Sequence, residues 1–121
     1  MQLDAKGQFK HGYGTEKICG RKLALNYEMF RNDALAYDKQ KSDTVSICST
    51  KSSKKISITA KDFPYWGFWT PDQGGAPFLC IEPWHGHADF VDFTGEFKDR
   101  EGSEYLLPGK EQTFRYTIQV G

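Results

Sequence analysis

Apolar and polar residues alternate along much of this chain, the pattern of β-strands that bury one face. Such alternation predicts strands over residues 23–29, 45–48, 56–60 and 114–120, with a hairpin through the polar turn at 51–54. No stretch of a dozen residues has a helical period. The pattern therefore predicts an all-β protein.

Two compact apolar stretches lie between these strands, FPYWGFWT at residues 63–70 and APFLCIEP at residues 76–83. The second is apolar on both faces, as expected of a strand that is covered on both sides. Pro108 and Gly109 suit the central positions of a type II turn, because proline fixes φ and glycine accepts a positive φ. Seven or eight short strands without helices indicate an antiparallel β-sandwich.

Composition narrows the classes of partner. The 121 residues make one domain, and 16 basic residues balance 16 acidic ones, without a basic stripe. A nucleic-acid partner is therefore not expected. The chain has no apolar run long enough to span a membrane and no signal-like stretch in its first twenty residues, so we expect a soluble, cytoplasmic protein. The sequence pattern does not indicate an oligomeric state.

Cys19, Cys48 and Cys80 are an odd number of cysteines, widely spaced and without a CxxC pair. This favours reduced thiols in the core or in strands over a disulfide framework or a zinc site.

Glu82 breaks the most apolar stretch of the sequence. Alternation places it on the same face as Phe78 and Cys80, where an ionised carboxylate is costly unless it is paired or hydrogen-bonded. Pro83 cannot donate to a sheet ladder, so we expect strand pairing to lapse there and Glu82 to stand at a strand end, flanked by Trp84. A carboxylate beside aromatic rings can act as a general base near neutral pH, and such rings suit the apolar faces of a sugar. The alternative is a strand-end glutamate that pairs with a lysine or an arginine.

Two other segments carry weaker candidates. His85, His87 and Asp89 could suggest a metal cluster, but an H-x-H pair without a further ligand is a poor zinc signature, and we expect solvent-exposed loop histidines and no metal. Asp33 stands where one predicted strand ends and another could start. Its alternative to a functional role is a turn aspartate that bonds nearby backbone.

These segments together resemble a known family. Residues 63–90, followed by residues 98–102 and 106–110, resemble the C-terminal part of the aldose 1-epimerases, or galactose mutarotases, and are closest to the LacX-like branch with its "CIEPW…G.AD" segment. Residues 27–35 are similar to the "F.NDAL" segment of that branch. The resemblance covers roughly residues 23–120, and both motifs occur in the family's order.

The resemblance implies a galactose mutarotase-like β-supersandwich and a cofactor-free isomerase that interconverts the α and β anomers of an aldohexose. It implies Glu82 as the general base and Asp33 as a ligand for sugar hydroxyls, and the Trp84 ring beside them suits the same sugar. A role in galactose or lactose metabolism follows only from the family name.

Family members are more than twice as long, and their catalytic histidines lie in the N-terminal half. We therefore expect residues 1–121 to be the C-terminal portion of an epimerase-like domain, with the N-terminal half missing and activity in doubt for this chain alone. The alternatives are a non-catalytic carbohydrate-binding protein and a defunct remnant.

Overall fold

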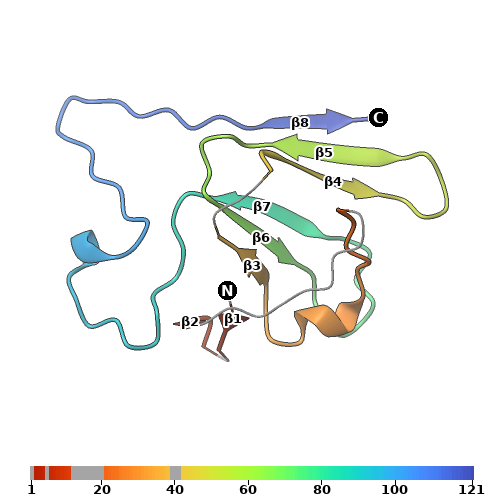
Figure 1. Cartoon of the computed structure of the whole chain (residues 1–121), viewed down its shortest axis with the longest axis horizontal. Helices are drawn as coiled ribbons and strands as arrows, with labels where there is room; N and C mark the ends of the chain where they lie inside the picture. The colour runs from red at the N-terminus through yellow and green to blue at the C-terminus, as the bar shows by residue number, and fades with distance from the viewer. Residues whose placement is uncertain (1, 5, 12–20, 39–41) are drawn as a thin grey trace.

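The computed structural model describes residues 2–4, 6–11, 21–38 and 42–121 (Figure 1). These residues form short strands and two turns of 3-10 helix. The elements are β1 (Gln2–Leu3), β2 (Phe9–Lys10), η1 (Tyr27–Phe30), β3 (Leu35–Tyr37), β4 (Thr44–Cys48), β5 (Lys55–Thr59), β6 (Tyr65–Trp69), β7 (Cys80–Trp84), η2 (Phe97–Asp99) and β8 (Thr117–Val120).

The strands form three antiparallel sheets, in the orders β1-β2, β3-β6-β7 and β4-β5-β8. Figure 1 shows β4-β5-β8 along one side of β3-β6-β7, with the small β1-β2 hairpin near the opposite side. A long segment leaves β7, passes through η2 and returns to β8. The predicted all-β, antiparallel class is confirmed.

The predicted hairpin is confirmed as β4 and β5, whose register runs from Thr44↔Thr59 to Cys48↔Lys55. Serine and threonine side chains on one face bond across the strands, with oxygen–oxygen distances of 2.8 Å for Ser46–Ser57 and for the Thr44–Thr59 pair. Cross-strand pairs of this kind stabilise a sheet. The aliphatic side chains occupy the other face.

The strand predicted over residues 23–29 is wrong, because this segment runs into η1 at Tyr27. Asn26 caps the turn: its side-chain oxygen accepts a hydrogen bond from the backbone N–H of Met29 at 3.2 Å. A local cap of this type offers the backbone an alternative to strand pairing. The strand predicted over residues 114–120 is confined to β8, which pairs with β5 and is exposed throughout.

Two expectations for the stretch at residues 76–83 are also wrong. The strand begins only at Cys80, its residues are half-buried, and Phe78 before it is 50% exposed, so it is not covered on both sides. Pairing also continues past Pro83, which lies opposite Trp66, and Glu82 is central in β7. Among the described strands β7 pairs only with β6, and an edge strand tolerates the N–H that proline lacks.

Two buried clusters hold the described residues together. One contains Leu3, Phe9 and Ala36, with Trp84 and Phe90 packed against it. The sequence pattern did not predict this role for Phe9, which is fully buried, because the first twenty residues show no period. The second cluster contains Ile58, Ala60 and Trp66, and it lies where the two larger sheets meet.

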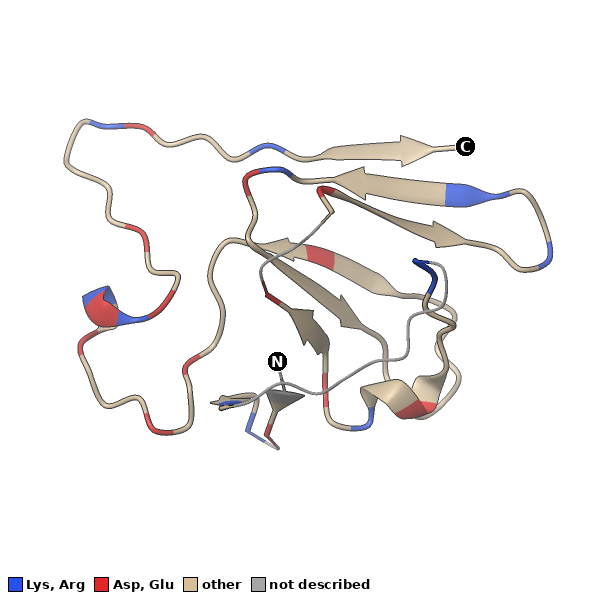
Figure 2. Cartoon of the chain, viewed as in Figure 1, with Lys and Arg blue, Asp and Glu red and all other residues tan. Residues whose placement is uncertain are grey.

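The predicted type II turn is confirmed, since Gly109 has φ 74° and the Lys110 N–H donates to the Leu107 carbonyl at 3.0 Å. Cys48 and Cys80 are free thiols in strands, as predicted, and Cys19 lies outside the described residues. Acidic and basic residues are scattered along the chain, with one acidic position inside β7 (Figure 2).

Candidate active site

A cavity of about 400 Å³ lies beside β7, and all three site residues predicted from the sequence line it. It is bounded by the β1-β2 hairpin, by the turn before β3 and by the loop that follows β7. Its lining includes Glu82, Trp84, Asp33, Trp69, Phe9 and His87. The fold therefore brings together residues that lie far apart in the sequence.

Trp84 holds the Glu82 carboxylate. The two side chains are two residues apart on β7 and so share a face, and the indole Nε1–H donates to Glu82 Oε2 at 2.9 Å. Within the described part of the chain no lysine or arginine forms an ion pair with Glu82, so the structure does not support the alternative of a charge-paired strand glutamate. The indole N–H therefore fixes one oxygen of the carboxylate.

Gly67 on β6 makes this arrangement possible. It lies directly opposite Glu82 in the sheet, and a Cβ built on Gly67 would stand 2.3 Å from Cζ2 of Trp84. Only glycine lets the indole ring cross the β6 backbone at this distance. Sequence reasoning missed Gly67, although a glycine inside the aromatic run YWGFW was a usable signal.

Asp33 has the turn geometry that the sequence offered as one alternative, and it also lines the cavity. It has a positive φ of 77°, and its Oδ1 accepts a hydrogen bond from the Ala34 N–H at 2.7 Å, so it is a turn aspartate. A non-glycine residue in the left-handed region is uncommon and is found preferentially at functional sites.

The prediction of solvent-exposed histidines is wrong for His87, whose side chain is only 1% exposed. Three aromatic rings cover it edge-on, with centroid distances of 5.0 Å to Phe9, 4.9 Å to Tyr65 and 5.6 Å to Phe90. The residues of β2 and β6 that cover the imidazole are distant in sequence, and no local pattern revealed them. His85 is half-buried and bonds Glu104.

Arg100 positions the loop that carries His87. Its Nη2–H donates to the His87 carbonyl at 2.9 Å, and its Nε–H donates to Asp89 Oδ1. Because a guanidinium donates in a fixed fork, these two bonds fix the loop against the segment after η2.

Cys80 shares the face of Glu82 on β7. Burial first, and then the neighbouring Glu82 carboxylate, raises the pKa of the Cys80 thiol. The thiol is therefore protonated at neutral pH and is no competing nucleophile or base beside the carboxylate.

Asp4 shapes the β1-β2 hairpin that closes another side of the cavity. Its Oδ1 accepts hydrogen bonds from the N–H groups of Lys6 at 2.8 Å and Gln8 at 2.9 Å. The backbone bond from Gln8 is the main cause that lowers the pKa of the Asp4 carboxyl.

The residues that the structure describes contain no group of three or more histidine, cysteine or acidic side chains arranged to hold a metal ion. They also contain no helix that is both long and apolar enough to cross a membrane.

Comparison with known proteins places this fold. A solved structure of a galactose mutarotase related enzyme from Lactobacillus acidophilus superposes with a TM-score of 0.75 and 30% identity, over 82% of this chain and 33% of that one. The chromosomal and plasmid LacX proteins of Lactococcus lactis subsp. lactis are each 29% identical over 100 residues, which is 83% of this chain and 33% of theirs. No protein-family model matches the chain.

The fold is thus a galactose mutarotase-like β-sandwich. Within that class, these matches confirm the predicted resemblance to LacX-like relatives of the aldose 1-epimerases. It spans about one third of the length of the relatives it matches.

Proposed function

We propose that this chain contributes the general base and part of the sugar pocket of an aldose 1-epimerase-like isomerase. The observation that carries the proposal is that Glu82, Trp84 and Asp33 line one cavity, with the Glu82 carboxylate bound by the indole N–H. Similarity to a galactose mutarotase related enzyme supports an aldohexose as the substrate.

Glu82 is the base in this proposal. Its carboxylate accepts the proton of the hydroxyl on C1 while the C1–O5 bond breaks, so that C1 becomes an aldehyde and the electron pair of the broken bond goes to O5. An acid, for which the resemblance implies a histidine, gives O5 a proton. The aldehyde then rotates about the C1–C2 bond, and the same steps in reverse close the ring on the other face.

The neighbours of Glu82 suit these steps. The indole N–H holds the Glu82 carboxylate in one orientation, and a carboxylate held in this way is a more effective acid–base group than a mobile one. Asp33 can accept hydrogen bonds from sugar hydroxyls with Oδ2, since Oδ1 is bonded to Ala34. The rings of Trp84 and Trp69 offer apolar surface to the C–H faces of the sugar.

The size of the cavity agrees with a monosaccharide. Small-molecule sites usually enclose about 300–1,000 Å³. This cavity, at about 400 Å³, lies at the small end of that range.

Polarimetry with freshly dissolved α-glucose and α-galactose tests the proposal, on a protein that joins this chain to the expected N-terminal half that supplies the acid. We expect accelerated mutarotation that Glu82→Gln reduces by about 10²–10⁴-fold, the usual contribution of a positioned proton-transfer group. Glu111→Gln, at an exposed position outside the cavity, is the control and should keep the full rate.

The same experiment separates the alternatives. Sugar binding without any acceleration would favour a non-catalytic carbohydrate-binding protein. Absence of both binding and a cooperative thermal transition would favour a defunct remnant. Acceleration that persists in Glu82→Gln would reject the assignment of the base.

A further inference from the structure

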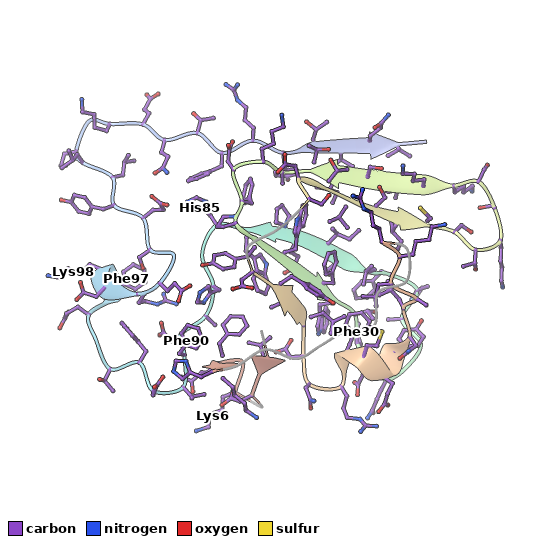
Figure 3. The ribbon with its side chains drawn as sticks, viewed as in Figure 1. Lys6, Phe30, His85, Phe90, Phe97 and Lys98 are labelled. Atoms are coloured by element: carbon purple, nitrogen blue, oxygen red, sulfur yellow. The ribbon has the colours of Figure 1, made fainter. Side chains whose placement is uncertain are left out.

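The long segment between η2 and β8 lies against the loop that follows β7 and has no part in the proposed reaction. We call its residues 100–114 the strap. In the described part of the chain no helix or strand lies between η2 and β8, so no regular backbone ladder holds the strap in place. Figure 3 shows His85 at the end of β7 and Phe97 on η2, shortly before the strap begins.

Two glycines let the backbone of the strap approach the loop. A Cβ built on Gly86 would stand 2.9 Å from the carbonyl oxygen of Gly102, and Gly102 has a positive φ of 76°. Side chains near both glycines meet at this contact, since His85 Nε2 bonds Glu104 Oε1. The strap is therefore joined to the loop by a histidine–carboxylate pair.

Each ring nitrogen of His85 faces a hydrogen-bond acceptor. Nδ1 lies 3.0 Å from the Asp62 carbonyl oxygen, and Nε2 bonds the Glu104 carboxylate. A carbonyl can only accept, and hydrogen bonds from His85 and then from Gln112 lower the pKa of the Glu104 carboxyl, which is therefore ionised at neutral pH. Both nitrogens must donate, so this contact requires the positively charged imidazolium.

Aromatic rings enclose the imidazole at the contact. The ring of Phe114, on the strap, lies 4.4 Å from that of His85, and the ring of Phe63, before β6, lies 6.3 Å away. The His85 side chain is 27% exposed, whereas both side chains of the pair His11–Asp92 are about two-thirds exposed. Water and salt screen a half-buried pair less than an exposed one, so the His85–Glu104 pair should contribute more.

Other ionisable groups also face His85. They come from three segments: Asp62 before β6, His87 on the loop after β7, and Arg100, Glu101 and Glu104 on the strap. Arg100 is already paired with Asp89. Glu101 accepts a hydrogen bond from the Tyr65 hydroxyl at 3.2 Å and lies 3.8 Å from His87 Nε2. Glu104 is thus the carboxylate that bonds His85.

We propose that His85 and Glu104 form a pH-sensitive contact, which holds the strap on the loop in mild acid and releases it as the pH rises. When His85 loses the proton on Nε2, the lone pair of that nitrogen faces the Glu104 carboxylate and the hydrogen bond is lost. Release opens one wall of a cavity of about 470 Å³ that shares Gly86 and His87 with the candidate site. The inference does not rest on the proposed function.

The direction of the pH effect follows from proton binding. The closed strap keeps the His85 proton that the open strap gives up, so closure weakens as the pH rises through the range in which histidine titrates. Because the pKa of Glu104 is lowered, the contact persists in mild acid and is lost only as the pH falls through that lowered value.

Amide hydrogen exchange of the full chain, followed by nuclear magnetic resonance, tests the inference. The reporter is the Ser103 N–H, which donates to the Arg100 carbonyl within the strap at 3.1 Å. After correction for the intrinsic effect of pH, its protection should fall about tenfold between about pH 5.5 and pH 8, as expected when one hydrogen bond between charged groups is lost. The Ser57 amide, in the central strand of the other sheet, should keep its protection.

Two variants remove the contact in different ways. Glu104→Gln removes the charge and keeps the size of an exposed side chain, so Ser103 protection should be about tenfold lower already at about pH 5.5 and should vary little with pH. His85→Phe keeps a ring against Phe114 and removes both N–H groups, and the same result is expected.

Asp92→Asn is the matched control. It removes the carboxylate of the exposed pair His11–Asp92, whose Nε2–Oδ1 distance is 2.7 Å and which lies outside the strap. Ser103 should keep the full pH dependence in this variant.

Three results would overturn the inference. Ser103 protection that follows Ser57 at every pH would mean that the strap opens only when the whole chain unfolds. A loss that persists in both Glu104→Gln and His85→Phe would assign the pH dependence to another group. Absence of Ser103 protection at about pH 5.5 would mean that the contact does not hold the strap.

Discussion

The two three-stranded sheets of this protein differ in how regularly polar and apolar side chains alternate along their strands. In β4-β5-β8 the side chains of β4 and β5 alternate regularly, and Ser57 in the central strand bonds its neighbour Ser46 across the sheet. In β3-β6-β7 the apolar run is broken by Gly67 and by Glu82, and these two residues lie directly opposite each other. Sequences commonly break local rules where function requires it. The comparison teaches that, in this protein, two irregular positions which face each other across a sheet lie at the candidate site.

The largest effect is expected from Gly67→Ala. The added methyl group would lie within 2.5 Å of two atoms of the Trp84 indole, so the ring must leave its place over β6. Overpacking of this kind costs about 1–3 kcal/mol of stability, and we expect a value at the upper end with loss of sugar binding. Urea unfolding and titration of the Trp84 indole signal measure the two effects.

Ser57→Ala is the matched change in the central strand of the other sheet. It removes one hydrogen bond and should cost about 0.5–1.5 kcal/mol while sugar binding stays intact. Equal costs for Gly67→Ala and Ser57→Ala would contradict the claim that β6 is built around the indole.

Trp84→Phe should have the next largest effect. Phenylalanine keeps an aromatic ring but removes the N–H that binds Glu82, so the carboxylate loses its fixed orientation. We expect mutarotation to slow by about tenfold, the equivalent of one hydrogen bond to a charged group, with a smaller change in sugar affinity. The measurement is polarimetry over a range of sugar concentrations.

Trp66→Phe provides the comparison for that variant. It removes an equivalent indole bond, from Trp66 Nε1 to the Ser42 carbonyl at 3.3 Å, in the cluster where the two sheets meet. It should lower stability by about 1 kcal/mol and leave the reaction rate unchanged. A rate loss as large as that of Trp84→Phe would show that the indole bond to Glu82 has no special role.

The smallest effect concerns the thiols. Because burial and the Glu82 carboxylate raise the pKa of Cys80, iodoacetamide should modify Cys80 more slowly than the exposed Cys48, and its reaction should rise only as pH rises toward that elevated pKa. Glu82→Gln removes one cause of the elevation, so Cys80 should then react faster at a given pH. Peptide mass spectrometry distinguishes the two thiols.

Cys48 lies in the other sheet and should react at the same rate in both proteins. An unchanged Cys80 rate in Glu82→Gln would mean that the carboxylate has no electrostatic influence at this position.

Regular alternation predicted the parts of the fold that depend on one buried face. The β4–β5 hairpin followed from this pattern and from its polar turn. The pattern failed at residues 23–29, because the Asn26 side chain caps a turn of 3-10 helix, and alternation alone does not register a cap. It also missed Phe9, which is buried by partners far away in the sequence.

The candidate site was predictable from the sequence only where a residue type is unusual for its local surroundings. Glu82 was detectable because a carboxylate is out of place in an apolar strand, and Trp84 because it shares that face. Gly67 required the register of β6 against β7, and the burial of His87 required contacts with β2 and β6. Those depend on the folded chain and not on local spacing.

The bond between Trp84 and Glu82 joins residues that are only two apart on one strand. The orientation of the carboxylate is therefore set by the backbone of β7 and does not depend on a distant part of the polypeptide. Any protein that keeps these two side chains and a glycine beneath the indole should keep the orientation of the carboxylate. This should hold even where the rest of the fold differs.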